Sequence, residues 1–165
     1  MDVVTDRPQA PPPYHAYATI TGVFVGTLAL AGGLARLLGR DPRDQTWLDF
    51  ATLSAASFKV ARTIARDDVT SFIREPFVEG DPRDPEEEHP VQTGGMEQAI
   101  GELVTCSRCV GTWAAAGLAT TQVLAPRFGR TVTWALAGAA INDFLQAGFA
   151  ALTQKANELE QDAGR

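Results

Sequence analysis

The feature that most restricts the fold is a stretch of twenty residues, 16–35, that carries no charged side chain. A helix that crosses the hydrocarbon core of a bilayer needs about 20 mainly apolar residues. Ile20, Phe24 and Leu28 are among the strongly apolar side chains in this stretch. The sequence therefore predicts a membrane helix from about residue 14 to residue 38.

Two later stretches repeat this pattern. Residues 109–126 carry no charge, and residues 131–154 carry only one, Asp143. Both are rich in Ala, Gly and Thr, which allow close contact between helices inside a bilayer. The overall hydrophobic share of 45% is ordinary for a soluble protein. This average hides the uncharged stretches, because polar residues are concentrated in the ends and loops. We expect an all-α integral membrane bundle with three or four spans plus an amphipathic helix.

Two alternatives stay open for these stretches. The first is a soluble bundle whose central helices are apolar on every side. The second concerns residues 16–35 alone, which would then be a secretory signal cleaved near Ala29-Leu30-Ala31. Residues 1–15 hold one basic residue and a run of three prolines, which makes a poor leader for such a signal.

Composition divides the chain into three parts. Residues 1–15 are polar and Pro-rich, and we expect a disordered tail there. Residues 16–154 form the predicted membrane domain, which includes an exposed acidic loop at 79–95 and a short connection at 126–130. Residues 155–165 are a polar C-terminal tail.

The segment 47–66 is predicted to be an amphipathic helix, because its apolar and basic residues fall on opposite faces. Its basic face carries Lys59, Arg62 and Arg66. We interpret it as a helix on the membrane surface, with its cations toward lipid phosphates. A tilted span with paired cations and a packed helix with a solvated face are the alternatives.

Arginines in the short loops indicate how the chain is oriented in the membrane, because short loops rich in Lys and Arg lie mostly on the cytoplasmic side. Three arginines follow the first predicted span, and Arg127 and Arg130 precede the last. Both groups reach the same side only if the helix at 47–66 also crosses the membrane. If it lies on the surface, the two indications conflict.

The only cysteines, Cys106 and Cys109, form a Cys-x-x-Cys pair before the second uncharged stretch. A helix N-terminus and the adjacent Arg108 favour a thiolate, which suits disulfide exchange. The pair can instead supply two zinc ligands, with His15, His89 or a second chain supplying the rest. A purely structural turn is the third interpretation, and spacing alone does not separate the three.

Two carboxylates are further candidates. Asp143 lies midway along the last predicted span, where an ionisable residue is costly to bury and is often functional. It is predicted to pair with a cation of segment 47–66, to serve in a transport path, or to form a helix–helix hydrogen bond. Glu102 is a candidate proton acceptor near the cysteines, or a helix N-terminal charge.

Two sequence blocks carry a family resemblance. The first comprises FKVAR at residues 58–62 and DDVTSFIREPF at 67–77, and the second is GELVTCSRCVGTW at 101–113. Together they resemble a bacterial membrane-protein family known as domain of unknown function 1360, over roughly residues 47–125. The family supplies no established activity or cofactor. The resemblance implies that eight residues belong to one structural unit: Arg62, Asp67, Thr70, Arg74, Glu102, Cys106, Cys109 and Trp113.

These observations favour a small, non-enzymatic protein of the bacterial cell membrane that crosses it several times and serves as an accessory or assembly subunit. Its expected partners are the lipid bilayer and another membrane protein or a second copy. The net charge of −6 gives no electrostatic support for nucleic-acid binding. The alternatives are a thiol-redox or zinc-binding membrane protein using Cys106 and Cys109, and a small transporter or channel using Asp143.

Overall fold

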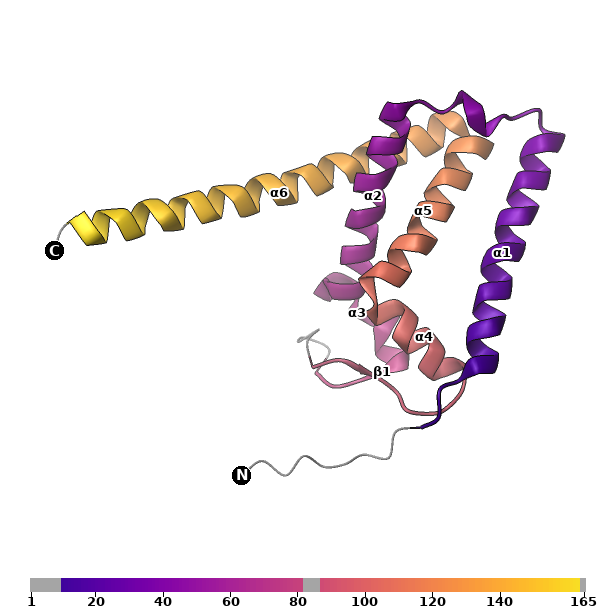
Figure 1. Ribbon diagram of the computed structural model, residues 1–165, viewed down its shortest axis with the longest axis horizontal. Helices are drawn as coiled ribbons and strands as arrows, with labels where there is room; N and C mark the ends of the chain where they lie inside the picture. Colours follow the sequence, from indigo (N-terminus) through magenta and orange to yellow (C-terminus); the bar gives the residue numbers. More distant parts are fainter. Residues whose placement is uncertain (1–9, 82–86, 164–165) are drawn as a thin grey trace.

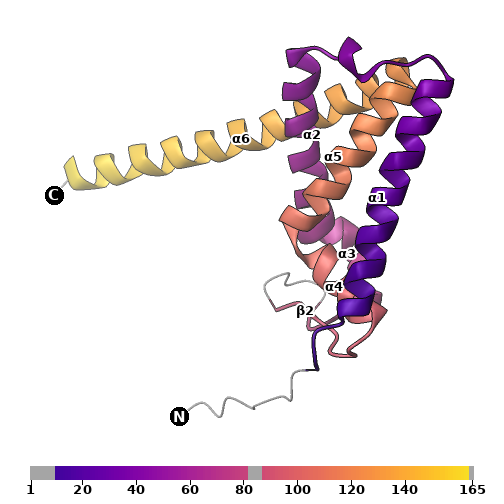
Figure 2. The ribbon, with the colours of Figure 1, turned by 45° about the vertical axis from the view of Figure 1, so that its right-hand side comes forward.

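The structure is a computed structural model that describes residues 10–81 and 87–163. Most of the predicted N-terminal tail and part of the predicted acidic loop lie outside these ranges. The described chain is mainly helical, as expected. α1 (Tyr14–Leu37), α2 (Trp47–Arg66) and α5 (Ser107–Leu124) lie side by side, with α5 between the other two (Figures 1 and 2).

The turn between α1 and α2 is determined by local sequence. α1 ends before Gly39, which has φ +64°, a conformation that glycine adopts without a Cβ clash. A short 3-10 helix, η1 (Pro42–Asp44), follows. Thr46 then caps α2 through a capping box with Asp49, which fixes the start of this helix.

The segment between α2 and α5 contains structure that an all-α prediction omits. After η2 (Asp68–Thr70), α3 (Ser71–Arg74) and η3 (Glu75–Phe77), two short strands pair antiparallel: β1 (Val78–Glu79) and β2 (His89–Pro90). α4 (Met96–Thr105) follows and leads into α5. Within the loop predicted to be exposed, Glu88 is buried.

The predicted connection at 126–130 is helical. Pro126 is the first residue of α6 (Pro126–Ala163), a position where its missing N–H removes no helical hydrogen bond. α6 packs on α2 and α5 with its first half and then extends away from the bundle (Figure 1). It continues as helix through the polar C-terminal residues to Ala163.

Small side chains fill the contacts between these helices. Apart from Val110, the buried apolar residues of the described chain are all alanines, lying on α1, α2, α4 and α6. Three are on α2, namely Ala56, Ala61 and Ala65, and two are on α6, Ala137 and Ala140. A core of this kind brings helix backbones close together, a packing common in membrane proteins.

Two described helices, α1 and α6, are long and apolar enough to cross a membrane. The expectation of three or four spans is not supported, because α2 and α5 are not among the described helices that are both long and apolar enough to cross a membrane. The most apolar windows of α1 and α6 are only 6% and 11% buried. Most of their apolar side chains are therefore left uncovered by the rest of the described chain.

Candidate functional site

The cysteine pair forms the turn from α4 to α5. Cys106 has extended backbone angles and is the N-cap of α5, where its Sγ accepts a hydrogen bond of 3.3 Å from the Cys109 backbone N–H. The Cys109 thiol also donates to the Cys106 sulfur, and the two Sγ atoms lie 2.6 Å apart. Both cysteines are free; Cys106 is half-buried and Cys109 is exposed.

The environment of Cys106 favours its anionic form. Burial raises the pKa of this thiol, but the hydrogen bonds from the Cys109 thiol and from the backbone N–H groups of Cys109 and Arg108 lower it. The positive charge of Arg108 acts in the same direction, and the pKa of Cys106 is held below its ordinary value. This arrangement pairs a nucleophilic sulfur with a neighbouring thiol that can complete a disulfide.

Zinc binding at the cysteines stays a prediction. In residues 10–81 and 87–163, no group of three or more His, Cys, Asp or Glu side chains is placed to hold a metal ion. His15 lies in the first turn of α1 and His89 in β2. A tetrahedral site at Cys106 and Cys109 would need two ligands beyond those that the described residues bring together there.

Glu102 lines a cavity of about 190 Å³ together with Cys109 and Tyr17. Glu102 and Trp113 also hold α1 against α4 and α5. Glu102 accepts hydrogen bonds from the Tyr17 hydroxyl and, at 3.0 Å, from the Gln98 side chain. Trp113 meets Phe24 edge to face, with ring centroids 4.9 Å apart. These contacts attach the N-terminal apolar helix to the rest of the fold.

Arg74 is the centre of a second cluster, at the C-terminal end of α2. Its side chain is fully buried and forms a two-pronged ion pair with Glu88, with a shorter Nε–Oε2 distance of 2.7 Å. Its Nη1 donates to the backbone carbonyls of Ile64 and Asp67. Thr70 also donates to the Asp67 carbonyl. Arg74 therefore satisfies carbonyls that the end of a helix leaves without partners.

Arg62 and Asp143 form a third group with Lys59 and Asp67, around a cleft of about 350 Å³ between α2 and α6. Lys59 donates to Asp143 at 2.7 Å, and Phe58 stacks on Phe144 beside them. The structure thus confirms the predicted pairing of Asp143 with a cation of the basic helix. Arg62 is exposed at this cleft.

The eight residues expected to form one unit lie on elements that pack against one another: α2 packs beside α5, where Ala61 approaches Gly111, and α3 and α2 also contact α4. Glu102 meets Cys109 at one cavity, whereas Arg74 and Arg62 each make their own contacts near Asp67. Sequence reasoning missed Glu88, because an acidic, Pro-rich segment indicates solvent exposure. It also missed the pairing of the buried Asp49 with Arg130, at 3.0 Å. A lone carboxylate in the first turn gives no signal for a partner 81 residues away.

A family model described as a protein of unknown function, DUF1360, matches residues 52–149. This range covers most of α2, the Arg74 cluster, the cysteine turn and the packed half of α6. No curated protein and no solved structure matches the chain. Because the matched range is more than half of the 165 residues, the chain belongs to the DUF1360 family.

Proposed function

We propose that the protein is a small integral membrane protein with a non-enzymatic accessory or assembly role. The membrane assignment rests on one observation: only 6% of the most apolar segment of α1 and 11% of that of α6 are buried. The core helix of a soluble protein buries its apolar face. The exposed apolar sides of α1 and α6 must therefore be shielded from water by something outside the chain, and a lipid bilayer shields them.

The contacts of α1 argue for a retained membrane helix and against a cleaved signal. Ala16 and Ala35, near its two ends, are both buried. Tyr17 and Phe24 contact Glu102 and Trp113. Cleavage would expose these partners and remove one wall of the bundle.

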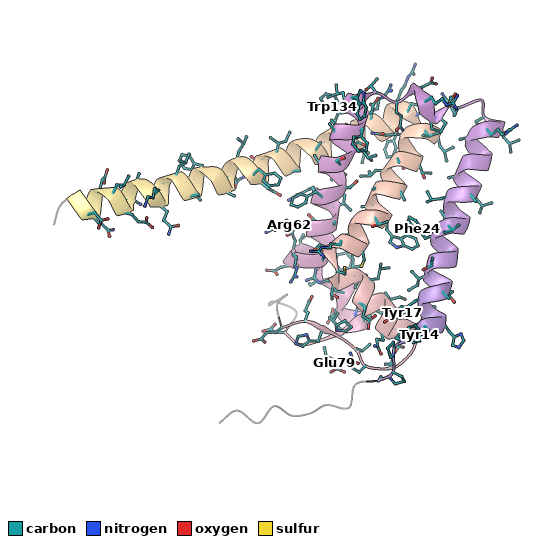
Figure 3. The ribbon with its side chains drawn as sticks, viewed as in Figure 1. Tyr14, Tyr17, Phe24, Arg62, Glu79 and Trp134 are labelled. Carbon is teal, nitrogen blue, oxygen red and sulfur yellow. The ribbon has the colours of Figure 1, made fainter. Side chains whose placement is uncertain are left out.

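The two ends of the bundle differ in a way that suits an oriented membrane protein. Tyr14 lies at one end of α1, and Trp134 lies at the opposite end of the bundle (Figure 3). Aromatic residues at both ends match the interfacial belts of membrane proteins. α2 runs back from the turn after α1 and α5 returns, so both groups of loop arginines lie at the Trp134 end (Figure 1). That end is assigned to the cytoplasm, and α2 and α5 then lie in the membrane beside α1.

The accessory role is favoured by how the charged side chains are used. Arg74 pairs with Glu88, Lys59 with Asp143 and Arg130 with Asp49. Each pair joins segments distant in the chain. These groups therefore serve to hold the fold together, and such a scaffold suits a subunit that binds other membrane components.

Extraction of cell membranes with alkaline carbonate tests the membrane assignment. The full chain is expected to stay in the pellet, and release into the supernatant would contradict it. Orientation is tested in a chain without its native cysteines. Glu97→Cys is expected to react with a membrane-impermeant maleimide in intact cells, whereas Arg43→Cys reacts only after lysis. Both positions are exposed, so the reverse pattern would mean the opposite orientation.

A second candidate function is thiol–disulfide exchange, favoured by the 2.6 Å approach of the two sulfurs. The Cys106 thiolate would attack a disulfide of a partner protein and form a mixed disulfide. Cys109 would lose its proton and displace the partner, leaving a Cys106–Cys109 disulfide and a reduced partner dithiol. The orientation above puts this turn away from the cytoplasm, in a compartment where disulfides persist.

A further inference from the structure

Three buried side-chain atoms of the described residues have no hydrogen-bond partner, and all belong to two glutamines. They are both amide atoms of Gln122, near the end of α5, and the amide nitrogen of Gln45, just after η1. Gln122 is only 4% exposed. A buried amide with neither donor nor acceptor satisfied is costly, so these atoms indicate a missing polar partner.

Both glutamines line a polar pocket of about 170 Å³ at the arginine-rich end of the bundle. Since one water occupies about 30 Å³, the pocket holds a polar group several times larger. Its charged lining is balanced: Arg40 and Arg130 are cationic, and Asp41 and Asp44 are anionic. The amide nitrogens add donors, and the Gln122 oxygen adds an acceptor. A ligand with one anionic and one cationic group fits this lining.

An apolar groove of about 210 Å³ adjoins the pocket, and Gln45 and Val123 line both. The groove runs between α1 and α5 and is lined mainly by Leu28, Ala31, Ala35, Ala116, Ala119 and Leu124. The site as a whole is therefore amphiphilic, with a charged, hydrogen-bonding head and an apolar channel leading from it along α1.

We propose that this site binds one phospholipid with a phosphoethanolamine head group. Arg40 and the glutamine nitrogens hold the phosphate, because guanidinium and amide N–H groups donate to its oxygens. Arg130 lines the pocket while it stays paired with Asp49. Asp41 and Asp44 accept from the ammonium, which a choline group with no N–H cannot satisfy. One acyl chain enters the groove between α1 and α5. This inference rests on the proposed membrane function, since α1 places the pocket at the depth of lipid head groups.

The head-group contacts are tested with the full chain purified in mild detergent. Binding of dioleoylphosphatidylethanolamine is measured by native mass spectrometry and by the thermal unfolding midpoint. Gln122→Leu and Arg40→Gln are expected to weaken binding by about tenfold or more, the effect of losing a hydrogen bond to a charged group. Arg36→Gln, at an exposed arginine outside the pocket, is the matched control and retains binding. Without lipid, Gln122→Leu unfolds at the same temperature or higher, which separates lost binding from misfolding.

The groove is tested with two neighbouring glycines of α1, each of which has open space where a side chain would start. Gly32 lines the groove, so Gly32→Leu fills it and is expected to reduce lipid binding, whereas Gly33→Leu is the control. Inorganic phosphate alone is expected to give no thermal shift. A shift with phosphate alone, equal retention of phosphatidylglycerol, or unchanged binding by Gln122→Leu would overturn the proposal. Carbonate extraction tests the membrane assignment independently, so a failure of lipid binding would leave that assignment unchanged.

Discussion

Among single residues, the buried charged side chains are those whose substitution is expected to destabilise the fold most. Arg74 and Glu88 have side chains that are 0% and 1% exposed and are held in a two-pronged ion pair. Each is acceptable in the interior only because the other compensates its charge. Arg74 also binds the final carbonyls of α2, so the pair couples the β-hairpin to the end of that helix.

Glu88→Gln is expected to destabilise the protein by about 3 kcal/mol, because the buried guanidinium of Arg74 then has no counter-charge. Glu87→Gln removes the same charge at the exposed neighbouring position and is expected to have little effect. Denaturant unfolding in detergent, followed by circular dichroism, compares the two. Equal stability of the two variants would mean that the ion pair contributes little.

Cys106 should react as a thiolate at a lower pH than an ordinary cysteine does. Because its pKa lies below the usual value, the thiolate fraction near neutral pH is larger and alkylation by iodoacetamide is faster. The rate is followed across pH in the reduced protein, with each cysteine identified by peptide mass spectrometry. Arg108→Gln removes the favourable charge and is expected to shift the Cys106 midpoint upward. A Cys106 profile centred at or above about 8.5 would contradict this assignment.

At the scale of helices, α6 is held to α2 by polar contacts at two levels, Lys59 with Asp143 and Asp49 with Arg130. The Lys59 and Asp143 side chains are 22% and 37% exposed at the cleft between these helices. The turn into α6 is tighter. A Cβ on Gly129 would come within 2.5 Å of the Gln122 backbone. The backbones of α5 and α6 therefore lie too close together at this point for any residue larger than glycine.

The Lys59–Asp143 pair is expected to have a coupling energy of about 1 kcal/mol in a double-mutant cycle of Lys59→Met and Asp143→Asn, the size usual for polar contacts between membrane helices. Asp143→Asn also tests the transport alternative, because a proton or ion path that uses this carboxylate would lose flux in proteoliposomes. Flux that is present in the parent and absent from Asp143→Asn would favour transport over a structural pair.

Gly129→Ala is expected to destabilise the α5–α6 contact by about 1–3 kcal/mol, because the added methyl overlaps the Gln122 backbone. Gly138→Ala, in the same helix, meets nothing within 4 Å. It should be neutral or slightly stabilising, because alanine favours helix over glycine. Similar unfolding midpoints for the two variants would argue against close packing at Gly129.

Sequence patterns located these elements well and their partners poorly. The bounds of α1, α2 and α4 follow from the apolar stretch, the Thr46 capping box and the Gly94-Gly95 joint, all local signals. By contrast, Pro126 was read as a breaker when it starts α6. Glu88 was read as exposed because its neighbours are polar. Which carboxylate meets which cation depends on contacts between distant segments, and those have no local signature.

At the scale of the whole molecule, the cysteine turn and the paired glutamines lie at opposite ends of α5. The cysteine turn closes one end of the bundle with a reactive sulfur. The other end carries the arginines and the polar pocket. In the proposed orientation these ends face different compartments, so redox conditions on one side and lipid composition on the other would act on one short bundle.

The alanine core has a consequence for which mutations the protein accepts. Truncation of a buried alanine removes only one methyl group, whereas a larger side chain at the same position has no space to occupy. The alanines concerned are Ala56, Ala61, Ala65, Ala137 and Ala140. A substitution scan is expected to be one-sided. Ala56→Leu should cost more than Ala56→Gly, whereas Ala51→Leu on the exposed side of α2 is accepted. A core of large side chains fails when mutations leave holes, whereas this one fails when they add volume. Variation in the chain is therefore expected to be freest where its helices face outward.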